Sequence, residues 1–136
     1  MDFPAPDIHP DSPEGLTDGW RTVSLITWIG VFGALLCVAV ASRTIGRPIW
    51  WLGPVGNPAP FYFLVIPIVI TAMPILATMR RPQHIVRVGW ICALALFATA
   101  LPDFADSPAI AWAVTVIAVA ALVETIALQM VSRHYR

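Results

Sequence analysis

Glu124 is the residue whose type and position offer the clearest chemistry in this sequence. It is the only ionisable residue between positions 107 and 132, an apolar run long enough to cross a membrane. Ionisable groups inside membrane spans are rare and costly, usually face the protein interior, and mark proton or ion pathways. Glu124 is therefore a candidate intramembrane polar site.

The helical period predicts which way Glu124 points. At about 100° per residue, one narrow stripe holds four alanines, with Glu124 at its edge: Ala109, Ala113, Ala120 and Ala127. Small residues mark the faces on which membrane helices approach one another closely. We therefore expect Glu124 to face a neighbouring helix and not lipid.

Prolines and threonines form a second candidate feature, in residues 59–79. They share one narrow stripe of a helix: Pro60, Pro67, Thr71, Pro74 and Thr78. An internal proline removes a helical hydrogen bond, and Pro74 thereby frees the carbonyl of Ile70. The structural interpretation is a kink packed against neighbouring helices, and the functional one is a hinge or a small polar cavity.

Depth along the two helices predicts that these features meet. Thr71 lies nine residues before Arg80. Glu124 lies nine residues before Arg133, so both are about 13 Å from arginines at the same end. We expect a mostly protonated Glu124 that donates to the Ile70 carbonyl, close to Thr71. The alternative is an ionised Glu124 paired with an arginine that extends along the helix from the membrane surface.

Other signatures of catalysis are missing from the sequence. It has no glycine-rich phosphate loop, no His/Cys metal spacing and no Ser/His/Asp set. The histidines (His9, His84 and His134) all lie outside the apolar runs. Cys37 and Cys92 fall at different expected depths, so we interpret them as small buried hydrophobic residues without a disulfide. We expect no enzymatic activity, no cofactor and no metal.

Composition assigns the chain to the membrane. Of its 136 residues, 58% are hydrophobic and 12% are charged, against about 25% charged in soluble domains. Apolar runs predict four transmembrane helices, at residues 22–42, 59–79, 85–102 and 108–132. The third is the weakest, because it must include Ile85 and Val86, and a re-entrant segment is its alternative. The expected fold class is all-α, an integral membrane four-helix bundle.

Arginine placement predicts the orientation. In a four-span arrangement six arginines share one side: Arg21, Arg80, Arg81, Arg87, Arg133 and Arg136. Only Arg43 and Arg47 fall on the other side, so the six-arginine side and both termini should be cytoplasmic. Residues 1–19 hold five acids, four prolines and no base. We expect a disordered cytoplasmic tail there, or a segment that becomes ordered against a partner.

The segment between the first two predicted spans contains two adjacent tryptophans outside the apolar runs. Proline and glycine exclude a long helix there, while Trp50 and Trp51 are too apolar for free solvent. Together with Arg47, they predict an anchor at the membrane interface, where tryptophan is enriched. The alternative is docking to a partner protein, since tryptophan is a frequent interface residue.

Residues 43–80 also carry a resemblance. The stretch Arg43-Thr-Ile-Gly-Arg-Pro-Ile-Trp-Trp-Leu-Gly, followed by a proline-interrupted apolar helix, resembles small uncharacterised four-helix membrane proteins of actinobacteria. The resemblance carries no catalytic motif. It implies a multi-pass protein of a bacterial plasma membrane.

These features favour a protein that works by association. We expect an accessory or assembly subunit of a larger membrane complex, with the lipid bilayer and a membrane protein, or a second copy, as partners and no nucleic acid. Gly30, Gly33 and Ala34 offer the small-residue spacing that permits close helix contact, within the chain or between chains. The alternative function is a small proton-coupled transporter or channel that uses Glu124.

Overall fold

The computed structural model describes residues 18–134, which contain no β-strand. The long helices are α1 (Asp18–Thr44), α2 (Val65–Arg80), α3 (Ile85–Ala100) and α5 (Pro108–His134), with a short α4 (Asp103–Asp106). Single 3₁₀ turns, η1 (Phe61–Leu64) and η2 (Pro82–His84), precede α2 and α3. The prediction of an all-helical chain is confirmed for the described residues.

Four helical segments are long and apolar enough to cross a membrane. They are Asp18–Thr44, Phe61–Arg80, Ile85–Asp106 and Pro108–Arg133. The third segment, which was the weakest in the sequence, reaches this length because α3 is followed closely by α4. These four segments are typical of a multi-pass membrane protein.

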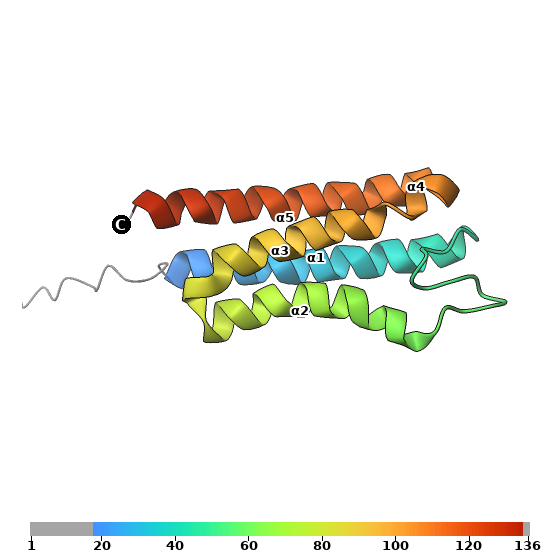
Figure 1. Cartoon of the computed structure of the whole chain (residues 1–136), viewed down its shortest axis with the longest axis horizontal. Coiled ribbons are helices and arrows are strands. Elements are labelled where there is room, and N and C mark those ends of the chain that lie inside the picture. Colours follow the sequence, from blue (N-terminus) through green and yellow to red (C-terminus); the bar gives the residue numbers. More distant parts are fainter. Residues whose placement is uncertain (1–17, 135–136) are drawn as a thin grey trace, which may run out of the picture.

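The four long helices lie side by side and run alternately in opposite directions (Figure 1), and their contacts close a ring. In this ring α1 packs against α2, α2 against α3, α3 against α5, and α5 against α1. Helices α2 and α5 are therefore diagonal to each other and are not packed neighbours. Short connections explain the contacts of α2 with α3 and of α3 with α5, because a helix that follows a tight turn packs against the helix before it. The connection between α1 and α2 is longer, since residues 45–64 separate them.

The helix ends follow ordinary capping chemistry. Helix α1 has Asp18 in its first turn and Arg43 in its last, as the helix dipole favours. It stops where Gly46 adopts a positive φ of 71°, and the Arg47 amide donates to the Ser42 carbonyl at 3.0 Å. Helix α5 begins at Pro108, a position at which a missing amide hydrogen costs nothing.

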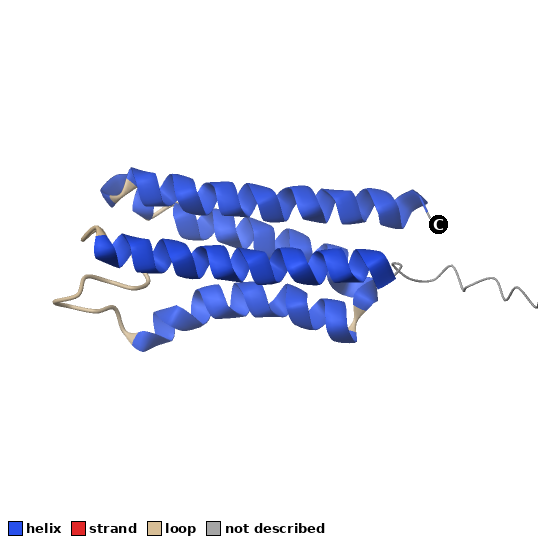
Figure 2. Cartoon of the chain, turned by 180° about the vertical axis from the view of Figure 1, so that it is seen from behind, coloured by secondary structure: helices blue, strands red, loops and turns tan. Residues whose placement is uncertain are grey.

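Helix α2 is bowed, as Figure 2 shows. Pro67 lies in its first turn, and Pro74 lies in its interior, where it lacks the amide hydrogen that a straight helix uses. The Thr71 hydroxyl donates to the Pro67 carbonyl at 2.8 Å, and the Thr78 hydroxyl donates to the Pro74 carbonyl at 2.8 Å. These four side chains are all buried, so this part of the predicted stripe faces the bundle interior. Pro60, the fifth member, lies before η1 and is exposed.

Small residues hold α3 and α5 close together. Gly89 and Ala93 of α3 are buried, and so are Ala111, Ala118 and Ala121 of α5. Small side chains let two helix backbones approach closely. Close packing matters in a membrane because the hydrophobic effect does not drive helices together in lipid, so dispersion contacts must hold them. Larger side chains fill the rest of the core, with Trp28, Leu96 and Leu128 almost completely buried.

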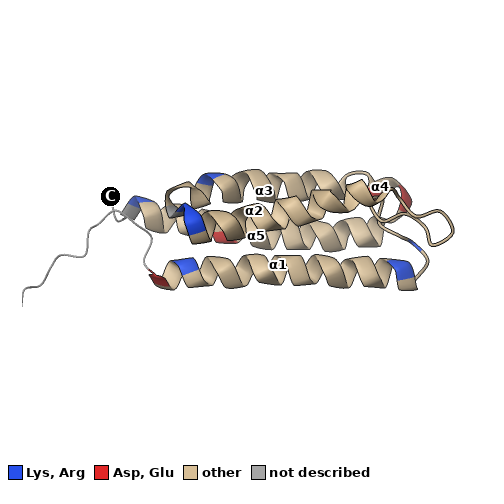
Figure 3. Ribbon diagram, turned by 90° about the horizontal axis from the view of Figure 1, so that it is seen from below, with Lys and Arg blue, Asp and Glu red and all other residues tan. Residues whose placement is uncertain are grey.

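Charge is concentrated at the two ends of the bundle (Figure 3). The end where α1 begins and α5 finishes carries Arg21, Arg80, Arg81, Arg87 and Arg133; we call it the basic end. The opposite end carries Arg43 and Arg47 with Asp103 and Asp106. The acidic tail expected at residues 1–19 lies outside the described residues, apart from Asp18 and Gly19, which belong to α1.

Candidate functional site

Glu124 lies in α5 on the side that packs against α1. Its side chain is only 9% exposed. Ser24 and Trp28, which lie one turn apart on α1, are the hydrogen-bonding side chains closest to the carboxyl group, together with Thr125 of α5 itself. We call Glu124, Ser24 and Trp28 the polar cluster.

No hydrogen bond of acceptable geometry joins the donors of the polar cluster to the carboxyl group. Ser24 Oγ, Trp28 Nε1 and both carboxyl oxygens of Glu124 are buried, and none has a hydrogen-bond partner with acceptable geometry. The Thr125 hydroxyl is already engaged, because it donates to the Ala121 carbonyl at 2.8 Å. Two donors thus lie near an acid with unused acceptors, and small side-chain rotations would complete the hydrogen bonds.

The expected link between Glu124 and the second span is wrong. Helix α2 is diagonal to α5, so neither Ile70 nor Thr71 is a neighbour of the carboxyl group. The Thr71 hydroxyl is instead bonded to the Pro67 carbonyl. Depth along a helix says at what level a residue lies, but it does not say which helix stands beside it.

The expected alanine stripe of α5 is also wrong. Ala109 and Ala120 are exposed, whereas Ala118 and Ala121, on other faces of the helix, are completely buried. Alanines occur all around α5, so their identity alone does not select the packed face. Glu124 is buried because α5 turns one side to α3 and a second side to α1.

Ser24 and Trp28 are functional candidates that sequence reasoning missed. Both lie in the first apolar run, and their spacing of four residues puts them on one face of a helix. Their polar atoms were the available signal, because a buried serine or tryptophan needs a partner. A further missed contact joins α3 to α5, where Trp90 Nε1 donates to Gln129 Oε1 at 2.9 Å.

The segment between α1 and η1 folds back over the end of the bundle. The Trp50 amide donates to Asp103 Oδ1 at 3.0 Å, and Trp50 Nε1 donates to the Thr99 carbonyl at 2.8 Å. Ile49 and Trp51 are almost completely buried. We call residues 45–60 the plug, because they close this end of the bundle.

The plug changes the interpretation of its aromatic residues. Trp51 is 5% exposed, so its ring is a core residue and is unavailable to lipid headgroups or a partner. Trp50 is half-buried and stacks edge-on against Phe63, with ring centroids 5.7 Å apart. Of the three residues expected at an anchor or docking site, only Arg47 is exposed.

Helix α1 presents small residues on its outer face. A Cβ atom added at Gly30 or Gly33 would meet no atom within 4 Å, so neither glycine is needed for packing inside the chain. Toward the plug, the same face forms a shallow groove of about 380 Å³, lined by Leu36, Cys37, Val40 and Ala41. Cys37, expected to be buried, is exposed in this groove, whereas Cys92 is buried as expected. We call this surface the α1 groove.

The residues described by the structure contain no group of three or more His, Cys, Asp or Glu that could hold a metal ion. Comparisons with protein-family models, with curated proteins and with solved structures found no match. A functional assignment therefore depends on the two features above, the polar cluster and the α1 groove.

Proposed function

We propose that this chain is an accessory or assembly subunit of a larger membrane complex, and that it binds a transmembrane helix of that complex through the α1 groove. One observation carries the proposal: the glycines of α1 face open space. Glycine lowers helix stability by roughly 1 kcal/mol relative to alanine. Two glycines in one helix turn that pack against nothing within the chain therefore favour a partner outside it.

The shape of the α1 groove fits a helix. Small residues continue along one side of α1 from Gly30 and Gly33 through Cys37 to Ala41, a length of about 16 Å along the axis. Leu36 and Val40 are exposed beside them and form the ridge of the groove. Packing of a ridge beside a row of small residues is the common geometry of helix contacts within membranes.

The cellular setting of this proposal is a bacterial plasma membrane with both termini in the cytoplasm. The arginine asymmetry between the two ends of the bundle supports this orientation. Reporter fusions after residues 54, 84, 105 and 136 should read outside, inside, outside and inside. A reporter at residue 105 that reads inside would contradict the four-span arrangement.

The partner proposal is tested by purification from native membranes in mild detergent. The wild-type chain should elute with a stoichiometric larger membrane protein. Gly33→Leu should abolish this complex, because a leucine fills the space that the partner helix occupies. Ala120→Leu is the matched control, since it adds similar bulk at an exposed position on α5, and it should leave the complex intact.

One outcome would contradict the accessory role, and another would contradict the α1 groove as the docking site. Wild-type protein that elutes as a clean homodimer, which Gly33→Leu converts to monomer, would show that the groove binds a second copy. A complex that survives Gly33→Leu but is lost with Ala120→Leu would place the partner on α5. In either case thermal unfolding of the purified variants shows whether folding itself was affected.

A proton-coupled transporter or channel is the second candidate, and the polar cluster favours it. A buried acid with unused acceptors beside two unused donors resembles the proton sites of membrane carriers more than a structural contact. If Glu124 exchanges protons, reconstituted vesicles should show a proton flux that Glu124→Gln abolishes. Infrared difference spectra should contain a carboxyl band that the same variant removes. Absence of both signals would contradict this candidate.

A further inference from the structure

A second groove lies between α2 and α3 at the basic end. It has two chemically different parts and a volume of about 320 Å³. The part within the span is apolar and is lined by Met73, Leu76, Ala77 and Val88. The part at the end of the helices is basic and is lined by Arg80, Arg81 and His84. We call the whole surface the α2–α3 groove.

The apolar part of this groove is open to the lipid side. Met73 and Leu76 are each about half exposed, at 49% and 46%. Met73 lies seven residues before Arg80, which places it about 10 Å deeper along the helix. A ligand that fills both parts must therefore have a polar head at the membrane surface and an apolar chain that continues into the bilayer.

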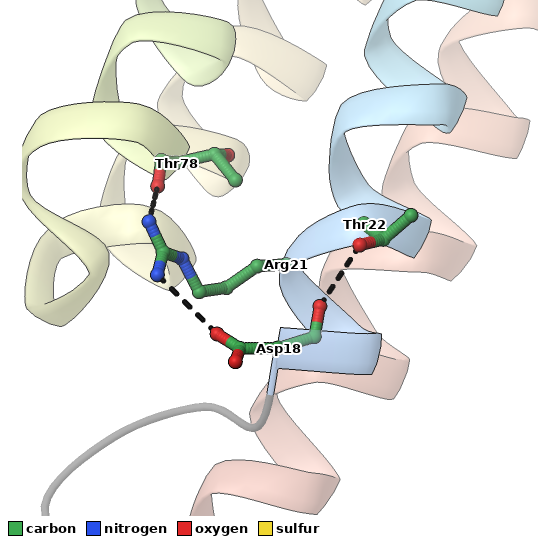
Figure 4. A network of polar contacts seen from close by, with 4 residues as sticks. All are labelled: Asp18, Arg21, Thr22 and Thr78. Carbon is green, nitrogen blue, oxygen red and sulfur yellow. Dashed lines mark hydrogen bonds and ion pairs between the residues drawn. The ribbon is translucent and has the colours of Figure 1, made fainter.

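The charge at the mouth of the groove is available for an anion. Arg80 and Arg81 are exposed and, within residues 18–134, have no ion-pair or hydrogen-bond partner for their guanidinium groups. Arg21, by contrast, has two partners, which Figure 4 shows. Arg21 is held by Asp18 Oδ1 at 3.5 Å and donates to the Thr78 carbonyl at 3.3 Å.

Arg21 has a structural reason for its contact, and Arg80 and Arg81 have none. The Thr78 carbonyl would normally accept from the amide of residue 82, but that residue is proline and has no amide hydrogen. Arg21 supplies the missing donor at the end of α2. Two further arginines at the same end satisfy no such need, and guanidinium groups bind phosphate in a bidentate manner.

We propose that the α2–α3 groove binds an anionic phospholipid of the membrane leaflet at the basic end. Its phosphate lies against Arg80 and Arg81, with His84 beside them, and one acyl chain follows Met73, Leu76 and Val88. Basic pockets between transmembrane helices are the usual sites for anionic headgroups. This site is independent of the proposed partner, because it lies on α2 and α3 and the partner groove lies on α1.

Native mass spectrometry of the full chain in detergent tests the proposal, with added phosphatidylglycerol as the probe and phosphatidylcholine as the neutral comparison. The wild type should retain phosphatidylglycerol in preference to phosphatidylcholine. The double variant Arg80→Gln/Arg81→Gln should lose about 25-fold in apparent affinity, since each arginine near an anionic surface contributes roughly fivefold. The double variant Arg43→Gln/Arg47→Gln removes the same charge from the opposite end and should bind like the wild type.

A second pair of variants tests the apolar part of the groove. Ala77→Phe fills it without a change in charge and should weaken phosphatidylglycerol binding, whereas Ala98→Phe, at an exposed position of α3, should not. Inorganic phosphate tests whether the headgroup alone is enough, and at equal concentration it should not displace the lipid. Equal loss in both double variants, equal binding of the two lipids, no effect of Ala77→Phe, or displacement by phosphate would each overturn the proposal.

The acidic segment before α1 is the rival occupant of the basic mouth. Residues 2–14 hold four acids, Asp2, Asp7, Asp11 and Glu14. A variant of the full chain in which each Asp is changed to Asn and the Glu to Gln removes their charge. This variant should bind phosphatidylglycerol like the wild type. If only the neutralised variant binds the lipid, the chain's own acids occupy the site and the proposal is wrong.

Discussion

The contact between Gly89 of α3 and Thr125 of α5 gives a sharp test of the packing. A Cβ atom at residue 89 would lie 2.8 Å from Thr125 Oγ1 and 3.1 Å from Thr125 Cγ2. Thr125 cannot turn away easily, because its β-branched side chain is completely buried and its hydroxyl is bonded to the Ala121 carbonyl. Gly89→Ala therefore forces α3 and α5 apart.

The expected magnitude combines two opposing effects. Overpacking of a tight core costs about 1–3 kcal/mol. Replacement of glycine by alanine within a helix returns roughly 1 kcal/mol. We therefore expect Gly89→Ala to lower the free energy of unfolding by about 1 kcal/mol. Gly30→Ala, where the added methyl group meets no atom within 4 Å, should not destabilise the purified chain.

A double-mutant cycle with Thr125→Ala separates the steric overlap between residues 89 and 125 from other effects of the Gly89→Ala change on stability. Once both γ atoms are removed, the nearest remaining atom of residue 125 is Cβ at 3.5 Å, which is an ordinary contact. In that background Gly89→Ala should be neutral or stabilising, which gives a coupling energy of about 1–2 kcal/mol between the two sites.

Equilibrium unfolding in mixed micelles with increasing dodecyl sulfate, followed by tryptophan fluorescence, measures each variant of the cycle. Reversible titration is preferable to a thermal scan, because irreversible unfolding would report a rate. A cost of Gly89→Ala that is the same in both backgrounds would refute the reasoning. So would a Gly89→Ala variant as stable as Gly30→Ala.

Three further predictions follow from burial and hydrogen bonding. Ala118→Leu should destabilise the chain by about 1–3 kcal/mol in the same titration, and Ala120→Leu by much less, because only Ala118 is buried; equal costs would mean that α5 is rotated. Asp103→Ala should cost about 1–3 kcal/mol, since the Trp50 amide loses its acceptor, and Asp103→Asn should cost less; equal costs would exclude this hydrogen bond. Glu124→Met should raise the free energy of unfolding by about 1–2 kcal/mol, because it removes two buried oxygens without partners. A destabilised variant would show that these oxygens are bonded in the membrane.

The number of long apolar helices could be predicted from the sequence, whereas their bounds could not be predicted to the residue: α1 is Asp18–Thr44 instead of 22–42 and α2 is Val65–Arg80 instead of 59–79. A span must satisfy its own backbone hydrogen bonds, so an uninterrupted apolar run is nearly sufficient to define it. The buried stripe of Pro67, Thr71 and Pro74 was also readable, since its members share one face of a helix. Both inferences depend only on residues within one helix.

The partners of Glu124 and the path of the plug could not be predicted in the same way. The position of Glu124 relative to Ser24 depends on which helix stands beside α5, and one helix's periodicity does not contain that information. The plug is fixed by the bonds of Trp50 to Thr99 and Asp103, about fifty residues further along the chain. A run of prolines and glycines predicts irregular backbone, but it does not predict where that backbone is secured.

The plug also has a consequence for biosynthesis. Its hydrogen bonds from Trp50 run to Asp103 and Thr99, which belong to the second helical hairpin and are synthesised after residues 45–60. Until α3 and α4 are made, the Trp50 amide and indole nitrogen lack both of these acceptors. Closure of this end is thus a late step of maturation, and a chain truncated before Thr99 should expose residues 45–60 to an added protease, whereas the full chain protects them.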